Sequence, residues 1–154
     1  MPKGKPVSRI FLDTNILLDI LIKDRPNHHY SGTLLGKLLD FDVYVSEDML
    51  TTIYYVAKEK QKALEFLAFI QNEWHIVSFG ADVMREGIAF ARKHGSDLED
   101  TLQCLCAKYN KCEAILTSDT SFVECGIRLE TYETFLLLHQ QTNSILERER
   151  KGKM

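Results

Sequence analysis

Short apolar runs alternate along this chain with segments in which apolar residues recur at helical spacing. Runs of this length suit strands that are buried on both faces of a sheet. Alternating strands and helices are typical of an α/β domain with a mostly parallel central sheet and helices on both faces. We therefore expect four to five strands, at Arg9–Leu12, Val43–Val45, Trp74–Phe79, Ala114–Leu116 and Ile127–Leu129.

The helical spacing predicts the elements between these strands. The first helix is expected to begin at Thr14 or Asn15, and a helical region runs from Glu47 through Ile70. We expect one domain, residues 9–141, between a flexible N-terminal tail (residues 1–8) and a charged C-terminal tail (residues 142–154). The other expected helices are Tyr30–Leu39, Ala81–Lys93, Asp97–Tyr109 and Tyr132–Gln141.

Composition narrows the possible functions. Nineteen Lys and Arg stand against 22 Asp and Glu, for a net charge of -3. A protein that only coats nucleic acid usually has a strong basic excess, whereas an enzyme with clustered carboxylates fits this balance. The apolar runs are too short to cross a membrane and the start lacks a signal-peptide pattern, so we expect a cytoplasmic protein. We expect reduced, core-packed cysteines at all four positions: Cys104, Cys106, Cys112 and Cys125.

Two acidic residues stand directly at the ends of predicted strands. Asp13 follows the first strand, and Asp119 follows the fourth after two polar residues. In a parallel sheet the active cleft lies beyond the carboxyl ends of the strands, so both would lie at that edge. A lone buried carboxylate is costly unless a cation or several donors accompany it. The structural alternatives are a helix cap for Asp13 and an Asx-turn for Asp119.

A third acidic site opens the helix that begins near Asp97. Ser96 and Glu99 have the spacing of a capping box, and acidic residues in a first turn suit the helix dipole. Asp97 and Asp100 would share a helix face, where their repulsion is unfavourable unless a cation lies between them. Each acidic site alone is more typical of a structural role, but the three together favour a cation site.

Three segments resemble, in order, the motifs of the PIN-domain family of metal-dependent ribonucleases. Ile10–Asn15 followed by Asp19 resembles the opening of that family, and Asp97–Leu102 resembles its acidic helix start. Thr117–Asp119 with Phe122 resembles its last motif. The resemblance covers nearly the whole chain and is strongest to the VapC-like toxins of bacteria. It implies a PIN-like three-layer sandwich that is often dimeric.

The resemblance also implies the ligands of a metal ion. The catalytic, metal-holding carboxylates of the family correspond here to Asp13, Asp100 and Asp119, with Asp97 as a weaker member of the metal site. Oxygen ligands of this kind favour Mg²⁺ or Mn²⁺.

Supporting residues are implied in the same way. Asn15 and Thr117 would orient the acids by hydrogen bonds, and Asp19 would either join them or tether a helix. Two positions depart from the family pattern. Thr52 stands where the family usually has a glutamate, although its hydroxyl can hold a metal-bound water. Ser121 stands where many relatives have a second acid.

We therefore expect an endoribonuclease that cleaves RNA with a metal-activated water, as the toxin of a toxin–antitoxin pair. The expected partners are the RNA substrate, an antitoxin protein and a second copy in a homodimer, with no membrane. The alternative is a catalytically weak or inactive relative that binds RNA or a protein partner. A phosphate-handling, response-regulator-like domain ranks last, because its paired acids and its lysine after the last strand are missing. The sequence assigns no substrate-binding residues.

Overall fold

The computed structural model describes residues 7–137. The predicted C-terminal tail, most of the predicted N-terminal tail and residues 138–141 of the last predicted helix lie outside the described residues. Within that range no helix combines the length and the apolar character that a membrane crossing needs.

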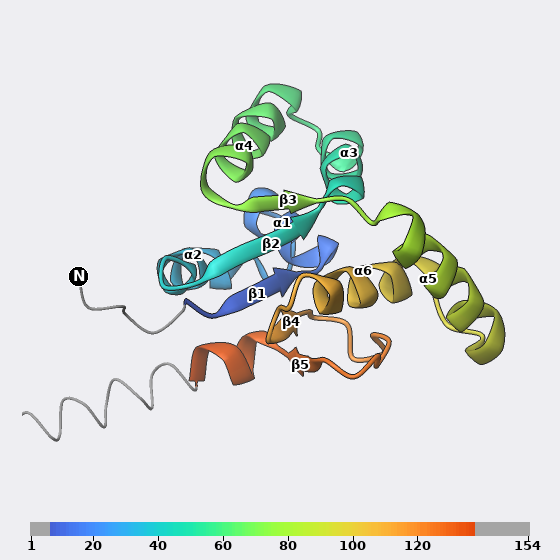
Figure 1. The fold of residues 1–154 in the computed structure, drawn as a ribbon. Helices are drawn as coiled ribbons and strands as arrows, with labels where there is room; N and C mark the ends of the chain where they lie inside the picture. The colour runs from blue at the N-terminus through green and yellow to red at the C-terminus, as the bar shows by residue number, and fades with distance from the viewer. Residues whose placement is uncertain (1–6, 138–154) are drawn as a thin grey trace, which may run out of the picture.

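A five-stranded sheet forms the centre of the domain, and every pair of neighbouring strands is parallel (Figure 1). The order is β3-β2-β1-β4-β5, which confirms the predicted α/β fold class. Only the strand expected at Trp74–Phe79 is clearly shorter, because Trp74 ends one helix and Gly80 begins the next. The strands are β1 (Arg9–Leu12), β2 (Asp42–Ser46), β3 (His75–Val77), β4 (Ala114–Leu116) and β5 (Arg128–Glu130).

Helices fill the connections between the strands. The part of the chain described by the structure has α1 (Thr14–Leu21), the 3-10 helix η1 (His28–Tyr30), α2 (Ser31–Leu38), α3 (Glu47–Val56), α4 (Lys60–Glu73), α5 (Gly80–His94) and α6 (Leu98–Tyr109). Residues 132–137 are also helical. Because crossovers between parallel strands are right-handed, α1 to α4 cover one face of the sheet and α5 and α6 cover the other. In Figure 1, α6 lies in front of the sheet and α1 lies behind β2.

The prediction of one helical region from Glu47 through Ile70 is wrong. The chain leaves helical geometry at Ala57, with φ -66° and ψ 131°, and resumes it after Glu59. Ala57 is buried, and the ammonium group of Lys60 binds the carbonyl oxygens of Tyr54 and Tyr55 at 2.6 and 3.1 Å. These two bonds satisfy carbonyls that the end of α3 leaves without helical partners.

The sheet order sets where a ligand can bind. β1 lies between β2 and β4. The connection that follows β1 leads to β2 on one side, and the connection that follows β4 leads to β5 on the other side. Ligands of open α/β sheets bind at such a switch point, beyond the carboxyl ends of the strands. The backbone N–H of Asp13 donates to the carbonyl oxygen of Leu116 at 3.0 Å, so the carboxyl ends of β1 and β4 are joined there.

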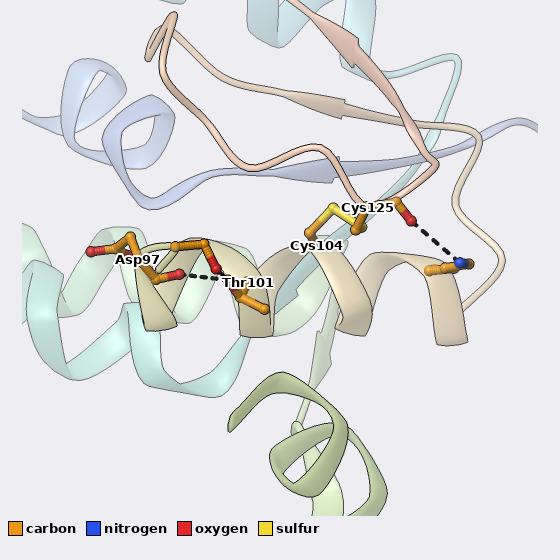
Figure 2. The surroundings of a disulfide bond; sticks show 6 residues. Asp97, Thr101, Cys104 and Cys125 are labelled. Atoms are coloured by element: carbon orange, nitrogen blue, oxygen red, sulfur yellow. Dashed lines mark hydrogen bonds between the residues drawn. A yellow bond between two sulfur atoms is a disulfide. The ribbon is translucent and has the colours of Figure 1, made fainter. Parts of the chain in front are cut away.

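A disulfide contradicts the expectation that all four cysteines are reduced. Cys104 on α6 is bonded to Cys125 in the loop before β5, with their Cα atoms 6.2 Å apart (Figure 2). Cys106 and Cys112 are free and buried, as expected. The tertiary fold brings together two cysteines that are 21 positions apart, and their spacing in the sequence does not reveal this contact.

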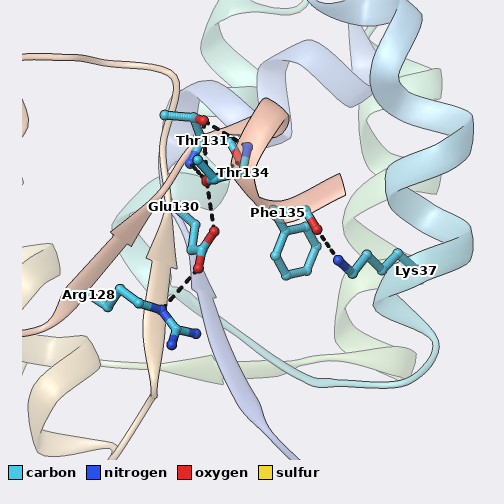
Figure 3. Close-up of polar contacts among 6 residues, drawn as sticks. All are labelled: Lys37, Arg128, Glu130, Thr131, Thr134 and Phe135. Carbon is cyan, nitrogen blue, oxygen red and sulfur yellow. Dashed lines mark hydrogen bonds and ion pairs between the residues drawn. The ribbon is translucent and has the colours of Figure 1, made fainter. Parts of the chain in front are cut away.

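The last described helical turn is fixed to the body of the domain by polar contacts (Figure 3). The buried Lys37 donates from its ammonium group to the carbonyl oxygen of Phe135. Glu130, also buried, forms an ion pair with Arg128 at 3.0 Å and accepts a hydrogen bond from the hydroxyl of Thr134 at 2.7 Å. These contacts attach the chain after β5 to both α2 and the sheet.

Candidate active site

Asp13 is the most buried acid at the carboxyl edge of the sheet, with 3% of its surface exposed. It occupies the N-cap position of α1, but its side chain makes no capping hydrogen bond, so a capping role does not explain it. Instead its Oδ2 accepts a bond from the hydroxyl of Thr117 at 2.9 Å. Burial raises the pKa of Asp13 to about 6, and the charges of Glu99 and Asp119 add to the effect.

Thr117 joins Asp13 to the third predicted acid. Its hydroxyl oxygen accepts a hydrogen bond from the backbone N–H of Asp119 at 3.1 Å. The Asp119 carboxylate accepts bonds from the backbone N–H of Ser121 at 2.9 Å and from its hydroxyl at 2.7 Å. This is the Asx-turn that we considered as the structural alternative for Asp119, and the Ser121 bonds lower the pKa of Asp119.

The start of α6 differs from the predicted capping box. Asp97 is the N-cap, and its carboxylate accepts from the backbone N–H of Asp100 at 2.9 Å. Ser96 instead contacts the hydroxyl of Thr101 at 2.9 Å, and Figure 2 shows Asp97 and Thr101 together in this first turn. The pKa of the half-buried Asp100 rises to about 7, through burial and then through the charges of Asp97, Asp13 and Asp119. Asp100 therefore shares the electrostatic environment of the strand-end acids.

Glu99 belongs to the same region, and the capping-box interpretation missed it. Its Oε1 accepts hydrogen bonds from the hydroxyl of Thr14 at 3.3 Å and from the amide of Gln103 at 3.2 Å. Burial raises the pKa of Glu99, followed by the charge of Asp48. The available signal in the sequence was Gln103, which lies four positions after Glu99 and therefore on the same face of the helix.

The supporting residues lie in two groups. Thr117 contacts two predicted ligands, whereas Asn15 accepts from the guanidinium of Arg25 at 3.3 Å. Asp19 is buried and accepts from Arg25 and from the hydroxyl of Tyr132, each at 2.7 Å. It therefore ties α1 to two later segments, which is the tether that we considered for it.

Thr52 turns back onto its own helix. Its hydroxyl donates to the backbone carbonyl oxygen of Asp48 at 3.3 Å. Asp48 in turn accepts a short hydrogen bond from the hydroxyl of Ser46, at 2.5 Å. The polar atoms at the start of α3 thus bind one another.

The carboxylate oxygens of Asp13, Asp100 and Asp119 are ligands of the type that a hard divalent cation prefers. Among residues 7–137, no three His, Cys, Asp or Glu side chains converge closely enough to form a ready-made metal site. However, Asp13 and Asp119 both raise the pKa of Asp100, so their charges interact. Mg²⁺ typically takes one or two protein carboxylates and keeps several waters, whereas structural zinc needs four converging ligands. A sparse oxygen site therefore fits Mg²⁺ or Mn²⁺ better than zinc.

A cavity of about 150 Å³ lies at the opposite edge of the sheet. Two of its charged groups, Arg128 and Glu130, form an ion pair with each other. Because the cavity lies at the amino ends of the strands, it is separate from the acids at the carboxyl ends. Its lining includes Arg9, Ala114 and Arg128, the first residues of three strands, together with Lys37, Phe41 and Phe135.

Comparison with known proteins gives one sequence family and one structural class. A family model described as the PIN domain matches residues 10–127. Ribonuclease VapC1 of Aquifex aeolicus (strain VF5) is 38% identical over 133 residues, which cover 82% of this chain and 92% of that protein.

Solved structures show the same architecture. VapC20 of Mycobacterium tuberculosis, a sarcin–ricin loop cleaving toxin, gives a TM-score of 0.62 at 13% identity, covering 73% of this chain and 92% of that one. A toxin–antitoxin complex from Klebsiella pneumoniae gives 0.63 at 17% identity, covering 80% of this chain and 97% of that one. At identities this low, both likenesses concern the fold alone.

Proposed function

The chain belongs to the PIN domain family, and we infer from this membership that it is a VapC-type ribonuclease, the toxin of a toxin–antitoxin pair. Its likeness to ribonuclease VapC1 extends over most of both chains and supports RNA as the substrate. A complex of a toxin with its antitoxin is among the proteins that share its fold, which makes an antitoxin the protein partner to test. A toxin that cleaves RNA acts where RNA is, so we propose a cytoplasmic location.

The observation that carries the mechanism is the proximity of three acids at the switch point of the sheet: the charges of Asp13 and Asp119 both raise the pKa of Asp100, and the charge of Asp119 raises the pKa of Asp13. We propose that these three acids hold Mg²⁺ or Mn²⁺, with Asp97 as a weaker contributor. A bound cation of this kind lowers the pKa of a coordinated water and offsets charge that develops on the phosphate.

The chain's own residues prepare that site. Thr117 holds the Asp13 carboxylate in one orientation, and Ser121 does the same for Asp119. Ser121 therefore provides orientation at a position where many relatives have an acid. Because both bonds are made within the folded chain, the two carboxylates are positioned before RNA binds.

A specific observation favours the second candidate, a catalytically weak domain that binds RNA or a partner. Thr52 brings no charge to the site and bonds to its own helix, and the acids of the described residues do not converge into a ready-made site. Weak metal binding would leave binding as the main activity.

Exposed apolar side chains support the proposal of a protein partner, either an antitoxin or a second copy in a homodimer. The end of α3 carries Tyr54, Tyr55 and Val56, and 85% of the surface of Tyr55 is exposed. Leu64 on α4 is also exposed. A cluster of this kind is typical of a surface that another chain covers.

The test is cleavage of a mixed RNA pool in the presence of Mn²⁺ by the native chain and by Asp13→Asn and Asp119→Asn. We expect each substitution to lower cleavage by at least about 100-fold, because even outer-shell partners of a metal are often worth 10- to 100-fold. Asp40→Asn is a matched control, since Asp40 is exposed in the turn before β2 at the other edge of the sheet.

Full cleavage by Asp13→Asn would remove the acids from the mechanism. If the native chain neither cleaves RNA nor binds Mn²⁺, the binding domain becomes the better description.

A further inference from the structure

Glu99 is a carboxylate that was not among the predicted metal ligands, and two side chains, Thr14 and Gln103, bind it next to the acidic site. Glu99 and Gln103 lie one turn apart on α6, and the Gln103 amide donates both to Glu99 at 3.2 Å and to the hydroxyl of Thr14 at 2.9 Å. The Thr14 hydroxyl itself donates to Glu99 at 3.3 Å. Because Thr14 directly follows Asp13, these bonds hold the Glu99 carboxylate beside the most buried acid of the site.

The charge of Glu99 is not offset by a neighbouring cationic side chain. Among the described residues, no ion pair with Lys or Arg neutralises Glu99. The Glu99 side chain is exposed to solvent, so a cation can reach its carboxylate from solution.

A second observation comes from Gln103, which is fully buried at 0% exposure. Its amide nitrogen is bonded twice, but its Oε1 has no hydrogen-bond partner in the described structure. Buried acceptors without a donor are rare and commonly indicate an ordered water or an ion. Because the same carboxamide contacts Thr14 and Glu99, its unpartnered oxygen lies next to the acidic site. A water held there by a cation would supply the missing donor.

Thr52 cannot supply a further carboxylate to the site. Its hydroxyl is bonded to the backbone of Asp48 in the same helix, whereas Glu99 approaches the site from α6 on the opposite face of the sheet.

We propose that Glu99 is a further carboxylate of the cation site and that Gln103 is the positioning residue that holds it there. This proposal rests on the function proposed above. The site would then combine Asp13, Asp100 and Asp119 with a fourth acid that comes from the first turn of α6.

The primary test measures Mn²⁺ binding to the full chain by isothermal titration calorimetry. We expect Glu99→Gln to weaken Mn²⁺ binding about 10-fold, while Glu65→Gln, a matched exposed position on α4, binds as the native chain does. We also expect Glu99→Gln to raise the melting temperature of the metal-free chain, because it removes an unneutralised carboxylate. A carboxylate with only a structural role would instead lower that temperature when replaced.

The positioning role of Gln103 is tested by combining its substitution with that of Glu99. We expect Gln103→Leu to raise the Mn²⁺ concentration needed for half-maximal cleavage several-fold, with cleavage at saturating Mn²⁺ retained. In the double variant with Glu99→Gln, the second substitution should add little, because Gln103 acts through Glu99. Additive effects would overturn the positioning role. If Gln103→Leu does not fold, the Glu99→Gln titration still decides whether Glu99 belongs to the site.

The outcomes separate this proposal from the proposed function. If the native chain binds Mn²⁺, Asp13→Asn does not, and Glu99→Gln binds like the native chain, the assignment of Glu99 is wrong and the ribonuclease proposal stands. If the native chain neither binds Mn²⁺ nor cleaves RNA, both proposals fail.

Discussion

Asp13, the N-cap of α1, and Asp19, in the middle of α1, show how two buried acids close together in the chain can have different roles. Both are nearly inaccessible, at 3% and 2% exposure. Each oxygen of Asp19 has a donor, from Arg25 and from Tyr132, and Arg25 also neutralises its charge. Asp13 has a single side-chain donor, Thr117, and acidic neighbours. Hydrogen-bond partners, rather than burial, therefore separate the structural acid from the proposed metal ligand.

The role of Asp19 gives a prediction about stability. Tyr132→Phe removes the 2.7 Å bond to Asp19 and leaves a buried charged acceptor with one donor fewer. We expect the free energy of unfolding to fall by about 1.5–3 kcal/mol, which is typical for a hydrogen bond to a charged group. Urea unfolding measures this loss, and RNA cleavage by the folded variant should remain at the native rate. An unchanged unfolding curve would mean that Asp19 does not depend on Tyr132.

Sequence reasoning found the strand-end acids and missed Glu99, for a physical reason. An acid that directly follows a buried strand of a parallel sheet must lie near the carboxyl edge of that sheet. Asp13 and Asp119 could therefore be identified from the local sequence pattern alone. Glu99 fits the spacing of a capping box, and that explanation is sufficient without any tertiary contact. Its bond to Thr14 spans 85 positions, and nothing in either segment specifies it.

At the scale of elements, α6 carries much of the site. Its first turn holds Asp97, Glu99 and Asp100, and its middle is bonded through Cys104 to the loop that follows Asp119. Gly87 allows α5 to pack closely on it, because a Cβ there would lie 2.6 Å from Leu102. The disulfide therefore joins two segments that both bear proposed metal ligands.

Breaking this disulfide should weaken both the fold and the site. The bond closes a loop between positions 21 apart, and a loop of that size contributes about 3 kcal/mol to the free energy of unfolding. We expect dithiothreitol to lower the native stability in urea unfolding by about that amount and to weaken Mn²⁺ binding. Cys112→Ser should respond to the reductant like the native chain, whereas Cys125→Ser should be less stable and insensitive to it. Four titratable thiols in the unreduced, denatured chain would show that the bond does not form.

The errors in element boundaries also have physical causes. The break between α3 and α4 contains no glycine or proline, and the sequence Ala57-Lys58-Glu59 is compatible with a continuous helix. The break arises from the burial of Ala57 and from the bonds of Lys60 to the end of α3. The strands at the centre were predictable because their continuous apolar character has few alternatives in a chain of this length.

At the scale of the whole molecule, a net charge of -3 conceals an uneven distribution. The carboxyl edge of the sheet brings together acids from β1, α6 and the loop after β4, and the pKa of Asp13, Glu99 and Asp100 is raised there. Such a concentration opposes folding when these groups are charged. The fold class was predictable because it depends on the alternation of elements, whereas this electrostatic cost depends on tertiary proximity.

The stability of the metal-free protein should therefore fall as the pH rises from about 4 to 7. The folded state keeps a proton on Asp13 up to about pH 6 and on Asp100 up to about pH 7, whereas the ordinary pKa of an aspartate side chain is 3.8. The folded state thus binds more protons than the unfolded state in this window, so raising the pH favours unfolding. The shift of the buried Asp13 alone corresponds to about 3 kcal/mol. Urea unfolding in a chelator, at intervals between pH 4 and 7.5, measures the slope.

Mn²⁺ distinguishes this electrostatic cost from a general effect of pH. Saturating Mn²⁺ should restore stability at pH 7.5, where the acids are ionised, and should have little effect at pH 4.5, where protons compete for the same oxygens. Asp13→Asn should show a shallower pH slope in the chelator, because a group that titrates abnormally has been removed. If Asp13→Asn keeps the full slope, other groups cause the pH dependence, and the raised pKa of Asp13 is not the reason that the metal-free site is unstable.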